Sequence, residues 1–417
     1  MNVFEILAII LTITALFAYI NERFIKLPTP IGVTLVGLII SLGLVIFKNE
    51  FLGLWAADFL ASLNFNEIVM GGMLSYLLFA GSLTVNLDNI NRQKWPILTL
   101  ATLGVIMSTF IVGTLTFYAL QIVGIHLSYL YALLFGALIS PTDPIAVLSI
   151  LRKVGVPKGI ETLITGESLF NDGVGVVVFS VILTLLGAGH GAEGESGGAM
   201  AVAQLFAQEA IGGIIFGMAI GLIAYYLLKS IDEYSVEILI TLSLVTGGYA
   251  LASHLHTSGP LAMVVAGIFI GNQGRLFAMS ERTREHIDTF WEVVDEILNM
   301  ILFVLIGLEV IIVNFDSKSL IIAILAIPLV LLGRFISVSL PISLMRLRKT
   351  FLPYTIRMMV WGGLRGGISI ALALSLPAGE ERDLIIKLTY AVVVFSILVQ
   401  GLTIGKIAAK IPTERIE

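Results

Sequence analysis

The sequence contains no cysteine, and only 13% of its 417 residues are charged. The absence of cysteine excludes disulfides, thiolate catalysis and cysteine-bound metal ions. Soluble globular domains carry about 25% charged residues, so the low charge content argues against that class. The formal net charge of -5 gives no indication of nucleic-acid binding. Most of the chain is apolar, with 57% hydrophobic residues and a mean hydropathy of +1.00.

The apolar residues form thirteen runs of about 20 residues, the length that an α-helix needs to cross a bilayer. We therefore predict one all-α polytopic membrane protein over residues 1–417, with about thirteen transmembrane helices and no separate soluble domain. The predicted helices lie near residues 3–20, 29–47, 67–85, 97–120, 129–151, 161–187, 201–228, 236–254, 258–271, 293–313, 319–344, 354–377 and 384–405.

The basic residues indicate the orientation, because Lys and Arg collect in short cytoplasmic loops. With thirteen spans, seventeen of the 24 Lys and Arg residues fall on the side that includes the C-terminus. Only four fall on the other side, namely Lys48, Lys318, Arg382 and Lys387. This asymmetry predicts an outer N-terminus and a cytoplasmic C-terminus in the cell (inner) membrane.

Two prolines, Pro141 and Pro144, lie near the middle of the predicted fifth span. Each removes a backbone donor, so we expect the helix to unwind there and to free carbonyl groups. These carbonyls, the Thr142 hydroxyl and the Asp143 carboxylate are oxygen ligands of the kind that a small hard cation prefers. The alternative is a structural kink in which Asp143 caps exposed amides.

Four polar residues share one face of the predicted sixth span, because Glu167 and Asn171, like Ser168 and Asp172, are four residues apart. Asp172 is almost central in this span. Desolvation disfavours the charged form of a lone buried carboxylate, so such a group can hold either a proton or a metal cation. The alternative is a purely structural hydrogen-bond cluster between helices.

Two arginines, Arg334 and Arg365, lie inside predicted spans. Arginine does not lose its proton in proteins, so each requires a carboxylate or carbonyl partner. The acids available for pairing are Glu167, Asp143 and Asp172. If both arginines pair with acids, one of the three carboxylates remains free to titrate.

Four glycines surround Arg365 within residues 361–367, which permits close packing or a second helix break. Two interrupted helices, one in each half of a chain, are typical of transporters built from inverted repeats. Other polar residues near span ends give weaker signals. We expect surface or capping roles for His254 and His256, and positions facing a water-filled funnel for Asp295, Glu296 and Glu309.

Three motifs occur in order along the chain: Pro141-Thr142-Asp143-Pro144, Gly166-Glu167-Ser168-Leu169-Phe170-Asn171-Asp172-Gly173 and Gly362-Gly363-Leu364-Arg365-Gly366. Together they resemble the monovalent cation/proton antiporters, and most nearly the prokaryotic NhaP-type sodium/proton antiporters, which are relatives of eukaryotic sodium/proton exchangers. The resemblance covers nearly the whole chain. It implies exchange of Na⁺ or Li⁺ for H⁺, with no enzymatic reaction and no cofactor; K⁺/H⁺ exchange is the alternative.

The resemblance also implies an architecture. Members of this family are homodimers in which a mobile core domain moves against an interface domain. Here the core helices would lie near 97–187 and 319–405, and the interface helices near 1–85 and 201–313. Two unwound helices, those that hold Thr142 and Arg365, would cross in the core.

By the same resemblance, the cation would bind to Asp172, Ser168 and Thr142, with a main-chain oxygen near Asp143 and water. Members with Asn before the carrier aspartate resemble electroneutral exchangers. Because Asn171 precedes Asp172, the resemblance implies one-for-one exchange.

The resemblance further implies that Arg334 pairs with Glu167, and that Arg365 compensates Asp143 and the helix ends at the crossing. A remote alternative is an intramembrane aspartyl protease that uses Asp143 and Asp172 as a dyad. The Gly-x-Gly-Asp order expected of such a protease is absent, because residues 172–175 run in the opposite order.

Overall fold

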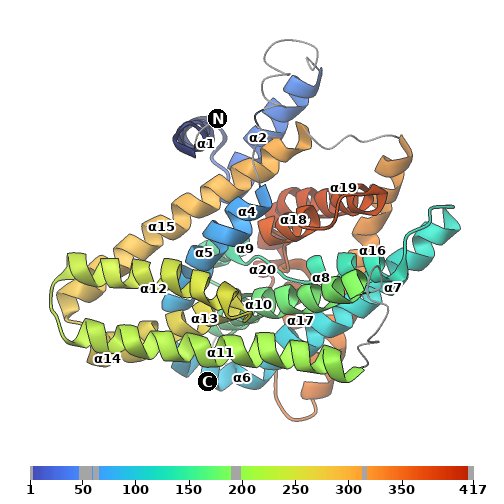
Figure 1. Ribbon diagram of the computed structural model, residues 1–417. Coiled ribbons are helices and arrows are strands. Elements are labelled where there is room, and N and C mark those ends of the chain that lie inside the picture. The colour runs from blue at the N-terminus through green and yellow to red at the C-terminus, as the bar shows by residue number, and fades with distance from the viewer. Residues whose placement is uncertain (1–2, 47–58, 60–64, 189–198, 312–316, 412–417) are drawn as a thin grey trace.

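The structure is a computed structural model that describes residues 3–46, 59, 65–188, 199–311 and 317–411 (Figure 1). Every regular element in these ranges is a helix, which confirms the all-α prediction. Eight of the described helices are long and apolar enough to cross a membrane. The predicted span ends at 47 and 313, and Lys48, lie outside the described residues.

Many of the helices in the described ranges follow one another with short connections. Their bounds are α1 Val3–Ile20, α2 Thr29–Ile46, α4 Phe65–Ile68, α5 Leu74–Leu83, α6 Leu87–Thr99, α7 Val105–Ile122, α8 Tyr129–Leu138, α9 Ile145–Val154, α10 Lys158–Ala188, α11 Ala199–Lys229, α12 Tyr234–His254, α13 Gly259–Phe269, α14 Arg275–Phe277, α15 Glu281–Leu308, α16 Ser317–Met345, α17 Thr355–Trp361, α18 Gly367–Leu374, α19 Glu380–Phe395 and α20 Gly401–Ala408. Single π-helical turns continue α6 into α7, α13 into α14 and α19 into α20.

Two helices begin earlier than the hydropathy predicts. The helical segment expected from residue 97 begins at Leu87, because α6 is polar while α7 is apolar. The segment expected from residue 293 begins at Glu281, where the Ser280 hydroxyl accepts a hydrogen bond from Thr283 N at 3.3 Å and caps α15. Hydropathy locates the apolar part of a helix and misses polar turns that extend beyond it.

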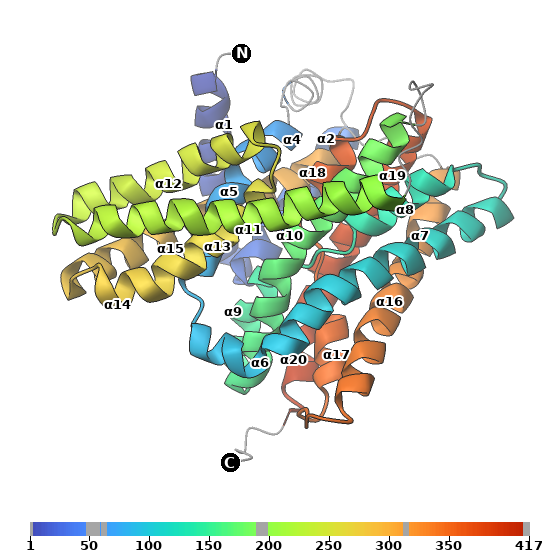
Figure 2. The same ribbon diagram turned by 60° about the horizontal axis from the view of Figure 1, so that its bottom comes forward.

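The helices pack in two groups that adjoin along α10 and α13 (Figures 1 and 2). In one group, α7 packs against α8 and α16, α10 packs against α6 and α8, and α16 packs against α19. In the other group, α11, α12 and α13 pack against one another, and α15 packs against α2 and α5. Figures 1 and 2 both show α12 and α14 on one side and α7, α8 and α16 on the other, with α11 running across the molecule between the two sides.

Both predicted helix breaks are present, one between α8 and α9 and the other between α17 and α18. The two breaks are neighbours, because Asp143 N donates a hydrogen bond to the Leu364 carbonyl at 2.8 Å in an antiparallel bridge. Segments more than 200 residues apart in the chain therefore meet at one point in the fold.

The contact between α7 and α8 depends on a glycine. A Cβ atom at Gly136 would lie 2.2 Å from the Thr109 carbonyl oxygen, which is closer than Cβ atoms approach any backbone atom. The two helices therefore pack backbone to backbone at this position, as small residues allow in membrane bundles.

We expect Gly136→Ala to lower the stability of the protein by about 1–3 kcal/mol, because the added methyl group forces α7 away from α8. The control is Gly247→Ala in α12, where a Cβ meets nothing within 4 Å and alanine favours the helix by about 1 kcal/mol. Thermal unfolding in detergent compares the two variants. Equal transition temperatures for both variants would contradict the close packing.

Candidate functional site

The first break places polar groups between two helix ends. α8 ends where the Ser140 hydroxyl donates to the Gly136 carbonyl at 2.6 Å. α9 begins where the Asp143 carboxylate accepts a hydrogen bond from Ile145 N at 2.9 Å. Of the two sequence hypotheses for Asp143, the structure therefore contains the capping contact.

The second break brings backbone unusually close to charged side chains. Leu364 N donates to the Gly362 carbonyl, and Arg365 N donates to the Ser396 hydroxyl, both at 2.9 Å. A Cβ at Gly363 would lie 2.7 Å from Arg334 Nε, and a Cβ at Gly366 would lie 2.5 Å from an Asp143 carboxylate oxygen. Only glycine fits at these two positions without displacing the charged groups.

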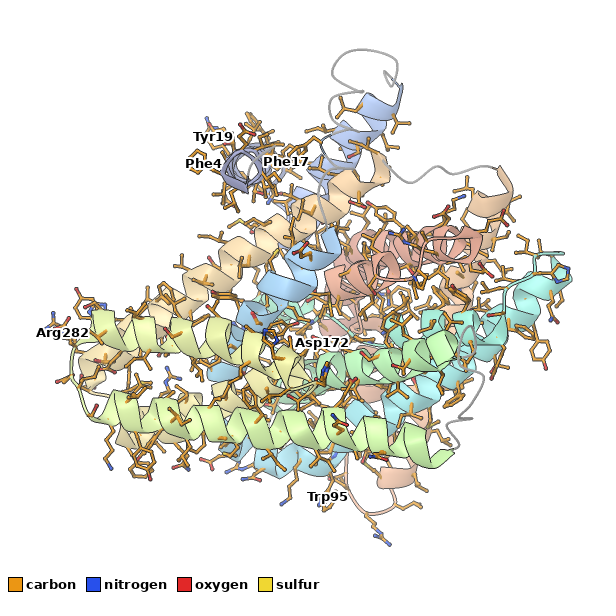
Figure 3. The ribbon with its side chains drawn as sticks, in the orientation of Figure 1. Phe4, Phe17, Tyr19, Trp95, Asp172 and Arg282 are labelled. Carbon is orange, nitrogen blue, oxygen red and sulfur yellow. The ribbon has the colours of Figure 1, made fainter. Side chains whose placement is uncertain are left out.

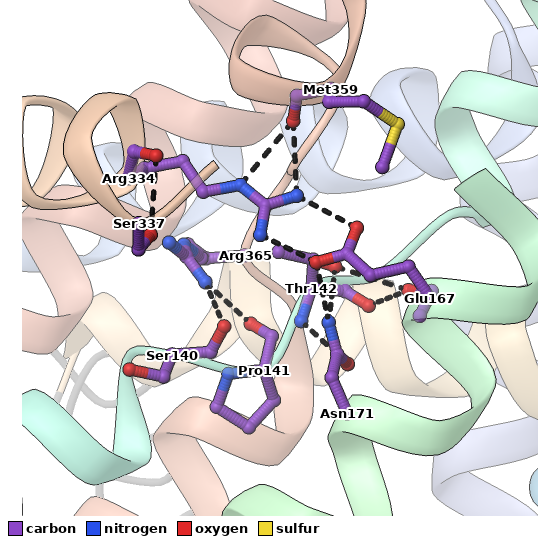
Figure 4. Close-up of polar contacts among 10 residues, drawn as sticks. Ser140, Pro141, Thr142, Glu167, Asn171, Arg334, Ser337, Met359 and Arg365 are labelled. Carbon is purple, nitrogen blue, oxygen red and sulfur yellow. Dashed lines mark hydrogen bonds and ion pairs between the residues drawn. The ribbon is translucent and has the colours of Figure 1, made fainter. Parts of the chain in front are cut away.

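The positive charge of Arg365 stabilises the carbonyl groups at the C-terminal end of α8. Its buried guanidinium donates from Nη1 to the Pro141 carbonyl at 2.9 Å and also to the Ser140 carbonyl (Figure 4). These oxygens follow the C-terminal end of α8, where the helix dipole is negative. The resemblance also implied compensation of Asp143, but no ion pair joins Arg365 to Asp143 within the described residues.

Arg334 and Glu167 form a bidentate ion pair. Arg334 Nη1 and Nη2 lie 2.6 and 2.8 Å from the two carboxylate oxygens of Glu167. The pair is almost fully buried, with residue exposures of 6% and 1%. Arg334 also donates to the Met359 carbonyl at 3.0 Å, near the end of α17 (Figure 4). Both oxygens of Glu167 are thus occupied by arginine.

Asn171 connects the ion pair to the first break. Its amide nitrogen donates to the Thr142 hydroxyl at 2.8 Å and to Glu167 at 3.3 Å, and its amide oxygen accepts from Thr142 N at 3.3 Å. The Ser168 hydroxyl donates to the Thr142 carbonyl. The structure therefore brings together Thr142, Glu167, Ser168 and Asn171, all of which the sequence singles out.

Asp172 differs from Asp143 and Glu167 in its contacts. Within the described residues its carboxylate has no hydrogen-bond or ion-pair partner, although the residue is only 8% exposed. It lies near the middle of the molecule (Figure 3), on the wall of a cavity of about 580 Å³. Thr142 and Asp143 line the same cavity.

The cavity lies between the two groups of helices. Its walls come from α5, the first break with α9, α10, α15 and the start of α18. Asp295 and Glu296 line it, which confirms their predicted position on a funnel. Glu309 is buried and is not among the lining residues. His254 and His256 are exposed and lie elsewhere.

Two lining residues were missed by the sequence reasoning. Asn299 on α15 and Ser369 on α18 are both buried, and their side-chain polar atoms have no hydrogen-bond partner of normal geometry. A signal for Asn299 was available, since it lies four residues after Asp295 on the same helix face. Ser369 has no comparable signal, because its position depends on where α18 crosses the first break.

The site offers hard oxygen ligands and one unpaired carboxylate. Hydroxyl, carbonyl and carboxylate oxygens suit a small hard cation, and the carboxylate can alternatively bind a proton. No group of three or more His, Asp or Glu residues with the spacing of a metal centre occurs in the part of the chain that the structure describes.

Comparisons with known proteins agree with this chemistry. A family model described as "Sodium/hydrogen exchanger, transmembrane" matches residues 11–410. The Na(+)/H(+) antiporter NhaP of Pseudomonas aeruginosa is 47% identical over 424 aligned positions, covering 99% of each chain. The Na(+)/H(+) antiporter NhaH of Halobacillus aidingensis is 34% identical and covers 97% of this chain and 96% of its own. The structure of the sodium proton antiporter MjNhaP1 from Methanocaldococcus jannaschii shares the fold, with a TM-score of 0.75, 22% identity and 98% coverage of both chains.

We expect Glu167→Ala or Arg334→Ala to destabilise the protein by about 3–5 kcal/mol, because each leaves one buried charge unpaired. The double variant Glu167→Gln/Arg334→Met removes both charges and should recover part of this loss. Thermal unfolding in detergent measures each effect.

The matched control for this ion pair is Glu161→Ala. Glu161 pairs with the exposed Arg152 at 2.8 Å, and an exposed pair contributes at most about 1 kcal/mol. A loss for Glu167→Ala no larger than that for Glu161→Ala would show that the buried pair is not needed for stability.

Proposed function

Because this chain belongs to the sodium/hydrogen exchanger family, we propose that it is a secondary antiporter that exchanges Na⁺ or Li⁺ for H⁺ across the cell membrane. Relatives named as Na(+)/H(+) antiporters, which match nearly the full chain, support this function. The single observation that carries the proposal is the Asp172 carboxylate, which faces the cavity without a partner among the described residues.

Asp172 is the carrier in this proposal. Glu167 is occupied by Arg334, and Asp143 caps α9, so neither is free to exchange a proton for a cation. The cation binds to the Asp172 carboxylate, with the Ser168 and Thr142 oxygens and a main-chain oxygen near Asp143 as further ligands. Asn171, Glu167, Arg334 and Arg365 hold this arrangement in place.

Competition at one carboxylate couples the two fluxes. Ionised Asp172 binds Na⁺, and protonated Asp172 cannot, so each crossing of the site carries either one Na⁺ or one H⁺. An unpaired carboxylate in the hydrocarbon region costs several kcal/mol, so the site changes sides only when its charge is neutralised. Exchange is then electroneutral, with one Na⁺ for one H⁺.

The fold supports an alternating-access arrangement. We propose thirteen membrane crossings in inverted repeats, with a core domain near 97–187 and 319–405 and an interface domain near 1–85 and 201–313 that forms a homodimer. The two packing groups of helices and their two interrupted members support this division. Arg152 and Arg275 line the cavity and lie in predicted cytoplasmic loops, which supports a cavity that opens toward the cytoplasm in this proposal. The N-terminus then lies outside and the C-terminus in the cytoplasm of an inner-membrane protein.

We expect Asp172→Asn to abolish cation-induced collapse of an imposed pH gradient in proteoliposomes, because an amide cannot carry a proton. The wild type should respond to Na⁺ and Li⁺. Asp88→Asn, which alters an exposed carboxylate at the start of α6, is the control and should leave the rate unchanged. Full activity of folded Asp172→Asn would exclude Asp172 as the carrier, and a wild-type response to K⁺ alone would reassign the cation.

We expect the initial exchange rate to be the same with and without an imposed membrane potential of either sign. A net charge moved through 100 mV changes the free energy by about 2.3 kcal/mol, so an electrogenic exchanger would respond strongly. Proteoliposomes with a K⁺ diffusion potential set by valinomycin provide the measurement. A rate that follows the potential would rule out one-for-one exchange.

A further inference from the structure

Helix α15 forms one wall of the cavity that Asp172 also lines. Polar residues form a stripe along one face of this helix. Asp288, Glu292, Asp295 and Asn299 recur at intervals of three and four residues, the spacing of a single helix face. All four line the cavity. Asp288, the first acid of the stripe, forms an ion pair with Arg275, so its negative charge is already balanced.

The stripe ends beside the crossing of the two breaks. Leu302, one turn beyond Asn299, packs so closely on the second break that a Cβ at Gly367 would lie 2.2 Å from it. Asp295 and Asp143 line the same cavity. The inner end of the stripe therefore lies next to the residues that surround Asp172.

Asn299 is the unusual member of the stripe. It is only 3% exposed and it lines the cavity. Its side chain meets the Asp295 carboxylate, but neither its amide oxygen nor its amide nitrogen makes a hydrogen bond of normal geometry. The Asp295 carboxylate can accept from the amide nitrogen only, so the amide oxygen has no donor, and a buried oxygen without a partner costs free energy unless it has a ligand. Its oxygen is a neutral hard ligand one helical turn from the Asp295 carboxylate.

We infer that Asp295 and Asn299 form a second binding site for a partly hydrated monovalent cation, on the α15 wall of the cavity. Asp295 supplies the charge, the Asn299 oxygen replaces part of the hydration shell, and the cation passes from there to Asp172. Ser369, which is 1% exposed and unpartnered on the facing wall of α18, is positioned to contribute a further oxygen. This inference rests on the proposed antiport and adds a capture step to it.

The capture site predicts a specific kinetic signature. Loss of one cation ligand before the carrier weakens entry and leaves the carrier chemistry intact, so the KM for Na⁺ should rise about fivefold with little change in maximal rate. Asn299→Leu and Asp295→Asn should both show this change. Asn299→Asp keeps an oxygen ligand and should retain the wild-type KM or lower it.

Proteoliposome exchange at varied Na⁺ tests these variants, with Glu285→Gln as the matched control, since Glu285 is exposed on α15 and does not line the cavity. Asn299→Leu removes a buried amide that makes no hydrogen bond of normal geometry, so this variant should unfold close to the wild-type temperature. Two results together would overturn the inference and assign Asn299 a structural role. Asn299→Leu would be less stable than both wild type and Asn299→Asp, and Asp295→Asn would keep the wild-type KM for Na⁺.

A binding experiment separates the two proposals. Na⁺ replaces choline at constant ionic strength, and thermal unfolding is measured for Asp172→Asn and for Asp172→Asn/Asn299→Leu. Stabilisation of the first but not the second supports the capture site, even if wild type shows no exchange and the proposed function fails. Exchange by wild type with the same Na⁺ KM in Asn299→Leu and Asp295→Asn overturns the capture site alone.

Discussion

The hydrogen bond from Asp143 N to the Leu364 carbonyl joins two interrupted helices, and the arrangement of the site depends on this contact. Each break exposes backbone groups inside a membrane protein, where water cannot satisfy them. Arg365 binds the carbonyl groups that follow α8, and Asp143 binds the amide that begins α9. Two of the charges within the helix bundle are therefore needed to make the broken backbone stable.

This requirement decides which acid is available for transport. Arg334 satisfies both the Met359 carbonyl at the end of α17 and the carboxylate of Glu167, so the second break also depends on a charged side chain. With Asp143 and Glu167 engaged, Asp172 is the acid of this group that has no partner among the described residues. The same contacts that stabilise the fold thus leave one carboxylate available for the proposed exchange of a cation for a proton.

Much of this site was predictable because local chemistry marks it. Pro141 and Pro144 cannot continue a hydrogen-bonded helix, and the four-residue spacing of Glu167 and Asn171 defines a polar face whatever the surroundings. The target of Arg365 was less predictable, because a guanidinium can bind a carboxylate or carbonyls and only the packed structure shows that Ser140 and Pro141 lie within its reach. The charge of residues 275–291 predicts a surface helix leading into the tenth span, and α15 begins there at Glu281; hydropathy alone detects only the apolar half of this helix.

The position of α15 explains why polar residues on it can matter for exchange. This helix packs against α2 and α5, whereas Asp172 lies on α10 in the other packing group. In the proposed mechanism the core domain that contains α10 moves, so a cation ligand on α15 stays in place while Asp172 moves away. A cation held only by α15 would remain behind, and one held only by Asp172 would travel. The cation therefore has to pass from Asn299 and Asp295 to Asp172 before the core domain moves. Only a cation bound to Asp172 can then cross the membrane.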